Sequence, residues 1–276
     1  MPVRPSGNIS ERAGAGDGHR NHRLRFHRRR CQARLRELEQ LESLDWEADY
    51  RRLKADCLHV RPVGDPLSGL FALLLLGIAE ADGVAVRIGI CRMAEELLHG
   101  RSLVVADVRE RRRVLLLAAV AATLTTEQVH LVVASDHEQQ AFMGWALPIV
   151  ERLGVAAAGI LATDNPGIRR RKYRSALVWV TPRELALDVL RDQLHWPDRS
   201  PGLPGKLDGV YGPASRSRSL MIPGLQRAFV DRLDRVLIDE ARTPVMIGSE
   251  ESPYPERETL TGVYALLSEC RSDQDY

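Results

Sequence analysis

The chain has 276 residues, enough for one large domain or two small ones, and hydrophobic residues make up 44% of it, so it can bury a sizeable core. The formal net charge is only +2, but residues 1–36 hold ten arginines against two carboxylates, which leaves +8 on this segment and −6 on the remainder. The four cysteines form no Cys-x-x-Cys pair, and the most apolar run, residues 70–79, is about half of the ~20 residues that cross a bilayer. Composition therefore excludes a zinc or dithiol motif and an integral membrane protein, and it predicts a soluble, cytoplasmic chain with an acidic body and a basic arm.

The basic arm comprises residues 1–36. Residues 1–22 are rich in Gly, Pro, Ser, Asn and His with few apolar anchors, and we expect them to be disordered. Residues 23–36 are either a solvated tail that begins a helix, or a helical contact with anionic lipid or with the acidic surface of a partner. Because Phe26 is the only aromatic residue of the arm, no pattern for stacking on nucleic-acid bases is present. The candidate contact residues are Arg23, Arg25, Arg28, Arg29 and Arg30.

Helices follow the arm. Apolar residues at helical spacing predict helices over residues 35–57, with Ser43 or Asp45 as an N-cap between two of them, and a mostly buried helix over 67–80. Farther along, we interpret Cys91 as a small apolar core residue.

Residues 102–123 have the order of elements in which phosphate loops occur. Residues 102–107 predict a short strand, residues 108–113 a turn, and residues 114–123 a helix of Leu, Ala and Val. A strand, a turn and a helix in this order place the N-terminus of the helix where it can bind a phosphate group.

The rest of the chain alternates between apolar strands and helices, which predicts an α/β domain with a mostly parallel sheet flanked by helices. A run beginning at Phe229 predicts a strand that ends in Asp231, and ligands of such sheets bind beyond the carboxyl ends of the strands. The helix over 181–193, taken alone, has a carboxylate-rich outer face. The other predicted strands are 129–134, 154–161, 176–180 and 245–248, with an exposed loop over 203–219 and a short helix over 260–267.

Residues 229–244 read Phe-Val-Asp-Arg-Leu-Asp-Arg-Val-Leu-Ile-Asp-Glu-Ala-Arg-Thr-Pro. This stretch resembles the second nucleotide motif of SecA, the bacterial preprotein translocase motor, which reads Val-Asp-Glu-Val-Asp-Ser-Ile-Leu-Ile-Asp-Glu-Ala-Arg-Thr-Pro. The resemblance implies a RecA-like, P-loop NTPase-type first nucleotide-binding domain over residues 37–248 and the truncated start of the preprotein-crosslinking region over 249–276. The matching residues are Asp239, Glu240, Arg242 and Thr243, and in a second similar segment Asp188, Arg191 and Asp192.

The phosphate loop of that family ends Gly-Glu-Gly-Lys-Thr. Its glycines let the backbone approach the phosphates, its lysine is a point charge between the outer phosphates, and its threonine holds magnesium. Arginine reproduces none of these three functions. The arginines that stand at these positions in this chain are then either a loose electrostatic patch for a polyanion or the solvated surface of a loop that binds nothing. The corresponding residues are Arg109, Glu110, Arg111, Arg112 and Arg113.

The second motif departs from the family at its catalytic position. Asp231 corresponds to a magnesium-binding carboxylate and Asp234 is also retained, but Arg232 stands where the family has the Glu that orients or deprotonates the attacking water. Losing the lysine, the hydroxyl and the base removes electrostatic stabilisation of the transition state. We therefore assign no catalytic residue and expect no cofactor, and ATP and Mg²⁺ are implied by the resemblance only.

The resemblance implies a role in protein translocation or secretion for a pseudo-ATPase that no longer hydrolyses ATP. Its partners would be the SecYEG channel, other Sec components or the anionic surface of the inner membrane, where the chain would be peripheral. One alternative is half of a split, ATP-driven translocase motor that needs a partner chain. Another is a RecA-like nucleic-acid-binding module, against which the composition of the arm argues.

Overall fold

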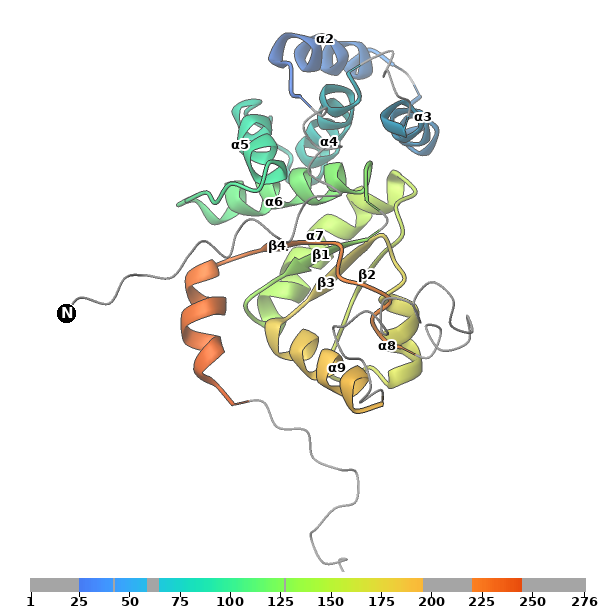
Figure 1. The fold of residues 1–276 in the computed structure, drawn as a ribbon. Coiled ribbons are helices and arrows are strands. Elements are labelled where there is room, and N and C mark those ends of the chain that lie inside the picture. Colours follow the sequence, from blue (N-terminus) through green and yellow to red (C-terminus); the bar gives the residue numbers. More distant parts are fainter. Residues whose placement is uncertain (1–24, 42, 59–64, 127, 196–219, 245–276) are drawn as a thin grey trace, which may run out of the picture. The chain divides into compact units, whose positions relative to one another are not determined.

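A parallel sheet of four strands lies at the centre of the fold. The computed structural model describes residues 25–41, 43–58, 65–126, 128–195 and 220–244. Within them the strands occur in the spatial order β2-β3-β1-β4, and every neighbouring pair is parallel. Their bounds are Val129–Val132 for β1, Ala157–Gly159 for β2, Leu177–Val180 for β3 and Arg227–Val230 for β4. The predicted α/β class with a parallel sheet is confirmed (Figure 1).

The two faces of the sheet carry separate cores, because successive strand residues point to opposite sides. One set packs with helices α4 (Pro66–Asp82), α6 (Val108–Ala122) and α7 (Asp136–Arg152), and the other set packs with residues of α9 (Pro182–His195) and with Met221 and Ile222. The inner strands β1 and β3 are therefore buried on both faces, which explains why they read as continuous apolar runs, whereas the edge strands β2 and β4 are partly exposed. The first set contains Val129, Leu131, Leu177, Trp179 and Phe229, and the second contains Val132, Val178 and Val180.

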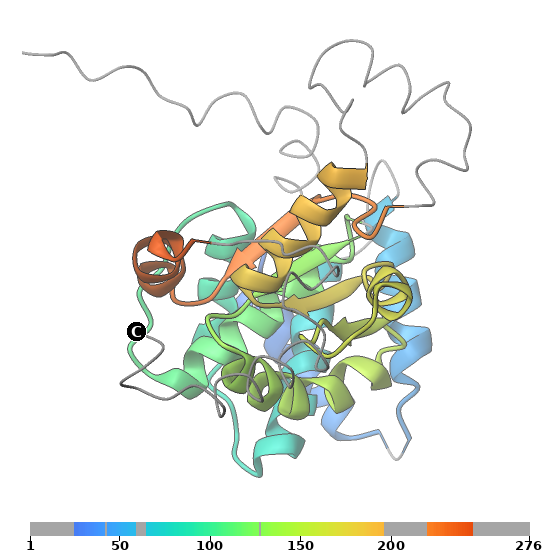
Figure 2. The same ribbon diagram turned by 90° about the horizontal axis from the view of Figure 1, so that it is seen from below.

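The helices form two layers around this sheet (Figure 1). Helices α8 and α9 lie on one side, and Figure 2 shows α9 crossing in front of the strands. Helices α4, α6 and α7 lie on the other side, with α2, α3 and α5 farther out. The bounds are Arg28–Glu39 for α2, Trp46–Leu58 for α3, Pro66–Asp82 for α4, Gly89–Leu98 for α5, Val108–Ala122 for α6, Asp136–Arg152 for α7, Pro166–Lys172 for α8 and Pro182–His195 for α9.

Helix α4 is the buried centre of the outer layer. Its N-terminus is capped by Asp65, which accepts a hydrogen bond from the backbone N–H of Ser68, and it ends at Gly83 in the left-handed conformation with φ 65°. From Pro66 to Ile78 almost every residue is buried, as the apolar sequence predicts. The N-cap predicted before α3 is also present, since Asp45 accepts a hydrogen bond from the N–H of Ala48.

Part of the predicted basic arm is a docked helix. Residues 28–36 belong to α2, whose Cys31 and Leu38 are buried against the core, and the Phe26 ring lies 5.7 Å from that of Phe71. Arg25, Arg28, Arg29 and Arg30 remain exposed. Arg23, also proposed as a contact residue, lies outside the described residues.

Five predicted segments differ from the structure or lie outside the described residues. Residues 102–107 form no strand, and Val104 is fully exposed, because no described strand pairs with this segment to satisfy its backbone groups. The strand predicted over 154–161 is limited to β2. The predicted loop 203–219, strand 245–248 and helix 260–267 lie outside the described residues. Among the helices that the structure describes, none is long and apolar enough to span a membrane.

Candidate nucleotide site

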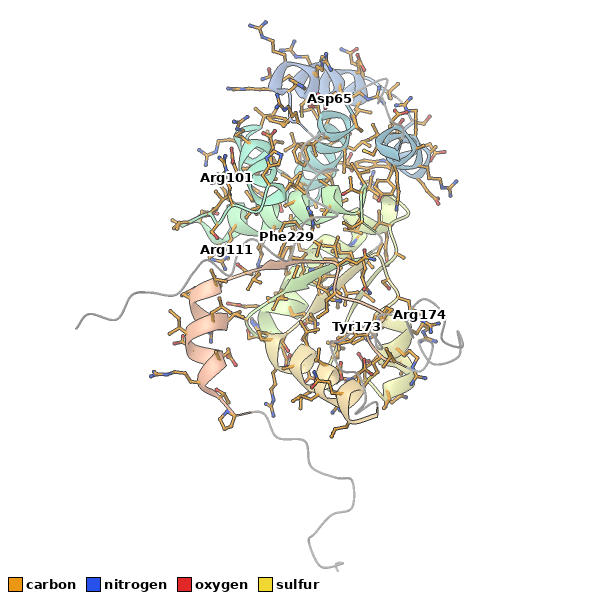
Figure 3. The ribbon with its side chains drawn as sticks, in the orientation of Figure 1. Asp65, Arg101, Arg111, Tyr173, Arg174 and Phe229 are labelled. Atoms are coloured by element: carbon orange, nitrogen blue, oxygen red, sulfur yellow. The ribbon has the colours of Figure 1, made fainter. Side chains whose placement is uncertain are left out.

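The candidate site lies where β4 ends and α6 begins. The backbone N–H of Asp231 donates to the carbonyl oxygen of Val132 at 2.8 Å, so β1 holds this residue one step beyond β4. The Asp231 side chain is only 3% exposed, and its Oδ1 lies 2.7 Å from Nε of Arg111. Figure 3 shows Arg111 between the start of α6 and the orange segment that follows β4. The guanidinium therefore occupies the position beside the carboxylate to which the resemblance assigns magnesium.

The Arg111–Asp231 contact is an ion pair rather than a well-directed hydrogen bond. The two atoms are close, but the Nε–H is not aimed along the contact, and neither atom has a hydrogen-bond partner among the described residues. Burial raises the pKa of Asp231, and nearby Glu138 adds to that rise, whereas the charge of Arg111 lowers it. Arg111 is thus the main group that favours the ionised carboxylate.

The N-terminus of α6 is filled by a side chain of the protein itself. Asp107 is the N-cap, and its Oδ1 accepts a hydrogen bond from the backbone N–H of Glu110 at 2.8 Å. This hydrogen bond is the main reason why the pKa of Asp107 is lowered. A helix N-terminus binds phosphate through its free N–H groups, and here a carboxylate already uses one of them.

The arginines that replace the phosphate loop are helical, contrary to the predicted turn. Helix α6 begins at Val108, because Asp107 caps it and arginine, unlike glycine, favours the helix. These arginines are also neither a loose electrostatic patch nor the solvated surface of a loop, because two of them form ion pairs with partly or fully buried carboxylates. Besides Arg111, Arg113 donates to Oδ2 of Asp82 through Nε at 2.8 Å, and Trp145 donates to the other oxygen of Asp82.

The remaining residues of that run are more accessible. Glu110 pairs with Arg87, Arg109 is exposed and Arg112 is half-buried. Asp82, at the end of α4, therefore joins α4, α6 and α7 through Arg113 and Trp145.

Arg232, which replaces the family's Glu, has the unusual backbone conformation φ 54°. For a residue with a Cβ, this left-handed conformation costs on the order of 1–2 kcal/mol. Its guanidinium lies 4.0 Å from Glu138 on α7 and 3.8 Å from the exposed Asp234. Arg235 also lies 3.8 Å from Glu138. A positive cluster thus faces Glu138 where the resemblance expects a general base.

The best-matching part of the motif, residues 237–244, takes no part in these ion pairs. Residues 235–242 form a π-helical segment, η2 (Arg235–Asp239), and a 3-10 turn, η3 (Glu240–Arg242). Asp239, Arg242 and Thr243 are exposed and Glu240 is half-buried. None of the contacts found around Asp231 in the described residues involves them.

The carboxylates of α9 are buried, which corrects the prediction of an outer acidic face. Arg169 of α8 is 3% exposed and bonds to Asp188 at 2.9 Å and to Glu184. The same guanidinium donates to the carbonyl oxygens of Leu161 and Asp164, at 2.8 and 2.9 Å. Asp188 also accepts from the hydroxyl of Tyr173 and from Arg191. These residues therefore hold α8 to α9 and to the end of β2.

Asp192 has a separate structural role. Its two carboxylate oxygens accept hydrogen bonds from the backbone N–H groups of Met221 and Ile222, at 2.8 and 2.9 Å. It thereby fixes the segment that leads into β4. In α9, Asp188 and Asp192 are thus engaged in tertiary contacts, and Arg191 pairs with Asp188 within the helix.

The described residues fit a magnesium–nucleotide group poorly. Asp231 is already paired with a guanidinium, and the helix N-terminus is capped by a carboxylate. No group of three or more His, Cys, Asp or Glu side chains within the described ranges is placed to hold a metal ion.

Comparison with known proteins decides the family. Residues 112–275, more than half of the chain, match the family model described as the SecA DEAD-like domain. The chain belongs to the SecA family. The resemblance seen in residues 229–244 and 181–193 is therefore confirmed, and the matched range contains both.

Relatives of this SecA-family chain are much longer. It is 33% identical over 150 residues to a protein translocase subunit SecA 2 of Rhodopirellula baltica. The aligned residues cover 53% of this chain and 22% of that relative. It is 27% identical over 241 residues to a SecA 2 subunit of Corynebacterium efficiens, covering 87% and 28%. A SecA 3 subunit of Magnetococcus marinus is 28% identical over 160 residues, covering 58% and 24%. The chain spans about a quarter of the length of these relatives.

Sequence reasoning missed three residues of the site in this SecA-family chain. Asp107 could have been found, because Asp107 and Glu110 have the spacing of a helix capping box. Glu138 and Asp82 carry no such local signal, since each acts on residues far away in sequence.

Proposed function

We propose that this chain takes part in SecA-type protein translocation without hydrolysing ATP, as a pseudo-ATPase that acts by contact. The observation that carries the proposal is the Arg111–Asp231 ion pair. An internal cation beside the carboxylate competes directly with magnesium, and electrostatic stabilisation by Mg²⁺ is a main source of catalysis in phosphoryl transfer. The Asp107 cap and the positive charge of Arg232 support the same conclusion.

A titration with a fluorescent ATP analogue, with and without Mg²⁺, tests the nucleotide part. We expect the full chain to show neither Mg²⁺-dependent binding nor ATP turnover. Arg111→Gly frees Asp231 and is expected to gain Mg²⁺-dependent binding, whereas Arg109→Gly, the same change in the same helix at an exposed residue, is not. Turnover by the unmodified protein that Asp231→Ala abolishes would contradict the proposal, and equal responses of the two glycine variants would remove the role of Arg111.

The contact surface is proposed to be the exposed basic end of α2, with anionic lipid or an acidic Sec component as its partner. Helix α2 is held in place by its apolar side while Arg28, Arg29 and Arg30 face solvent. Basic residues near an anionic bilayer contribute about 1 kcal/mol each at moderate ionic strength. In this proposal the chain is peripheral at the inner membrane, residues 1–36 are the arm, 37–248 the nucleotide-domain region and 249–276 the start of the preprotein-crosslinking region.

Vesicle binding tests this surface. Glutamine replacement of Arg28, Arg29 and Arg30 together is expected to weaken binding to phosphatidylglycerol-containing vesicles at least about tenfold. The matched control replaces three exposed arginines, Arg171 of α8, Arg174 in the turn between α8 and β3, and Arg183 of α9, and it should change binding little. Equal losses in the two variants would show that net charge alone is sensed. Tighter, salt-sensitive binding to DNA than to vesicles would favour the nucleic-acid alternative.

A further inference from the structure

Strand β4 has an outer edge with no partner. It is the last strand in the order β2-β3-β1-β4, and among the described strands it pairs with β1 only. The N–H of Asp231 donates to β1, and successive residues of a strand turn their backbone groups to opposite sides, so the groups of Phe229 also face β1. The N–H and C=O groups of Ala228 and Val230 therefore face outward, and no hydrogen bond joins them to a described residue. Such an edge is a template for another strand.

A second apolar segment is unpaired near the carboxyl end of β4. Residues 102–106 form neither helix nor strand, their backbone groups bond to no residue that the structure describes, and Val104 is fully exposed. This segment leads into α6, and Arg111 near the start of α6 contacts Asp231 just beyond β4. Figure 3 shows Arg101 and Arg111 on that side of the molecule. Two sets of unpaired backbone groups thus occur where one extended chain could satisfy them.

The side chains that follow β4 are apolar and uncovered as well. Leu233, Leu237 and Ile238 are 46%, 60% and 62% exposed, although they come directly after the strand. The charges of Arg111 and Asp231, the nearest buried ion pair, compensate each other. An occupant of this edge therefore needs apolar side chains and an extended backbone, and it needs no charge.

We propose that the outer edge of β4 is a docking site for another polypeptide, which adds an extended, apolar strand to the sheet. The added strand bonds through its backbone to Ala228 and Val230, and its other edge is then available to residues 102–106. This site uses neither nucleotide nor the arginines of α2. Its failure would therefore leave the proposed function standing, and the reverse also holds.

Residues 102–106 do not fill this place themselves, because both ends of the segment are fixed. The N–H of Arg101 donates to the carbonyl oxygen of Glu96 on α5, and Asp107 caps α6. The same two anchors hold the segment in any second copy of the chain. Pairing β4 with β4 of a second copy would leave residues 102–106 of both copies uncovered. These features favour a different polypeptide as the occupant.

Hydrogen exchange on the full chain tests whether the edge is open. We expect the amides of Ala228 and Val230 to exchange at least about tenfold faster than the amide of Phe229, which bonds to β1. Residues 103–106 should exchange as fast as Ala228. Equal protection of Ala228, Phe229 and Val230 in the isolated protein would overturn the proposal, because the edge would already be occupied.

A synthetic strand tests docking. The probe is the fluorescent peptide Lys-Thr-Val-Ile-Val-Thr-Lys, and its control carries N-methyl groups on the three central residues, which keep the side chains but lose their N–H donors. We expect the control to bind at least about tenfold more weakly, by fluorescence anisotropy. In the unmodified protein, the bound probe should slow exchange at Ala228, Val230 and residues 103–106, and this readout requires no variant.

A pair of variants locates the site on β4. Ala228→Pro removes an outward N–H and leaves the bonds to β1, so it should weaken binding of the probe at least about tenfold, whereas Ala228→Val should not. Urea unfolding checks that both variants fold. Absence of binding by the probe, equal binding of the two peptides, or equal binding to the two folded variants would overturn the proposal. Dimerisation of the protein that Ala228→Pro abolishes would overturn it too, because the occupant would be a second copy.

Discussion

Replacing Arg169 with methionine is expected to lower the free energy of unfolding by at least about 3–5 kcal/mol, because it leaves buried carboxylates without their cation. The guanidinium bonds to Asp188, which is 0% exposed, and to Glu184. Burial by itself lowers the pKa of Arg169, but its hydrogen bonds to Glu184 and Asp188 raise it overall. Methionine has a similar length and no charge, so the loss reports on the ion pairs and on the carbonyl contacts at the end of β2.

Urea unfolding measures this effect through the midpoint and the slope of the transition. Arg171→Met is the matched control, since Arg171 is exposed in the same helix, and it should change stability by no more than about 0.5 kcal/mol. Arg169→Lys keeps the charge but not the planar fork, so an intermediate loss is expected. A loss for Arg169→Met no larger than that for Arg171→Met would show that the network is not a main support of α8 and α9.

A triple replacement separates the cost of unpaired charge from the cost of lost packing. If Glu184 and Asp188 are both changed to leucine alongside Arg169→Met, no carboxylate is left without the Arg169 cation, and most of the lost stability should return. Burial also raises the pKa of Tyr173, with the carboxylate of Asp188 adding to the rise, so Tyr173 is a neutral donor to Asp188 wherever that residue is retained, and the triple variant removes its acceptor.

This network also shows what the sequence could and could not reveal. The carboxylates at 184, 188 and 192 are spaced along one face of α9, which the sequence shows plainly. Whether that face is solvated or buried depends on Arg169, which lies on another helix, and on the Met221 and Ile222 backbone. Periodicity identifies a face, but the partner of that face is a tertiary property.

The strands of the sheet could be predicted from the sequence, because their burial leaves a local pattern. The strands around Leu131 and Val178 are buried on both faces, so they read as short apolar runs bounded by turns, and the carboxylate after β4 could be placed at the edge of the sheet. Residues 102–107 have the same apolar composition and form no strand, because composition does not supply a pairing partner.

The sequence predicted individual residues of the candidate site but not the contact between them. Asp231 follows from the strand that precedes it, and the loss of the glycine turn follows from the arginines in the sequence. The contact of Arg111 with Asp231 joins residues 120 positions apart, and no local pattern specifies it. The helical start at Val108 was the part that local chemistry did specify, through Asp107 and Glu110.

The protein is expected to lose about 3 kcal/mol of stability between pH 6.5 and pH 4 through one side chain, His130 of β1. Burial lowers the pKa of His130 from 6.5 to about 4. The ring is fully buried with its centroid 6.1 Å from that of Tyr173, and the backbone of Arg227 approaches it without completing a hydrogen bond to either nitrogen. The folded state therefore holds the neutral imidazole.

The sign follows from the two pKa values. Above pH 6.5 the imidazole is neutral in both the folded and the unfolded chain, and no stability is lost. Between pH 6.5 and 4 the unfolded chain binds a proton that the folded chain does not, so the free energy of unfolding falls as the pH falls. The raised pKa of Asp231 acts in the opposite direction, because acid neutralises that buried carboxylate in the folded state.

His130→Phe isolates this contribution. Phenylalanine fills a similar volume and carries no polar nitrogen, so the variant should be at least as stable as the unmodified protein at pH 7 and should lose less stability on acidification. Urea unfolding at a series of pH values from 7 to 4.5 gives the difference in slope, and His137→Phe, at an exposed position of α7, is the matched control. Parallel stability curves for the unmodified protein and His130→Phe would mean that His130 gains a proton in the folded state near its ordinary pKa, and that the β1 core opens to solvent at that position.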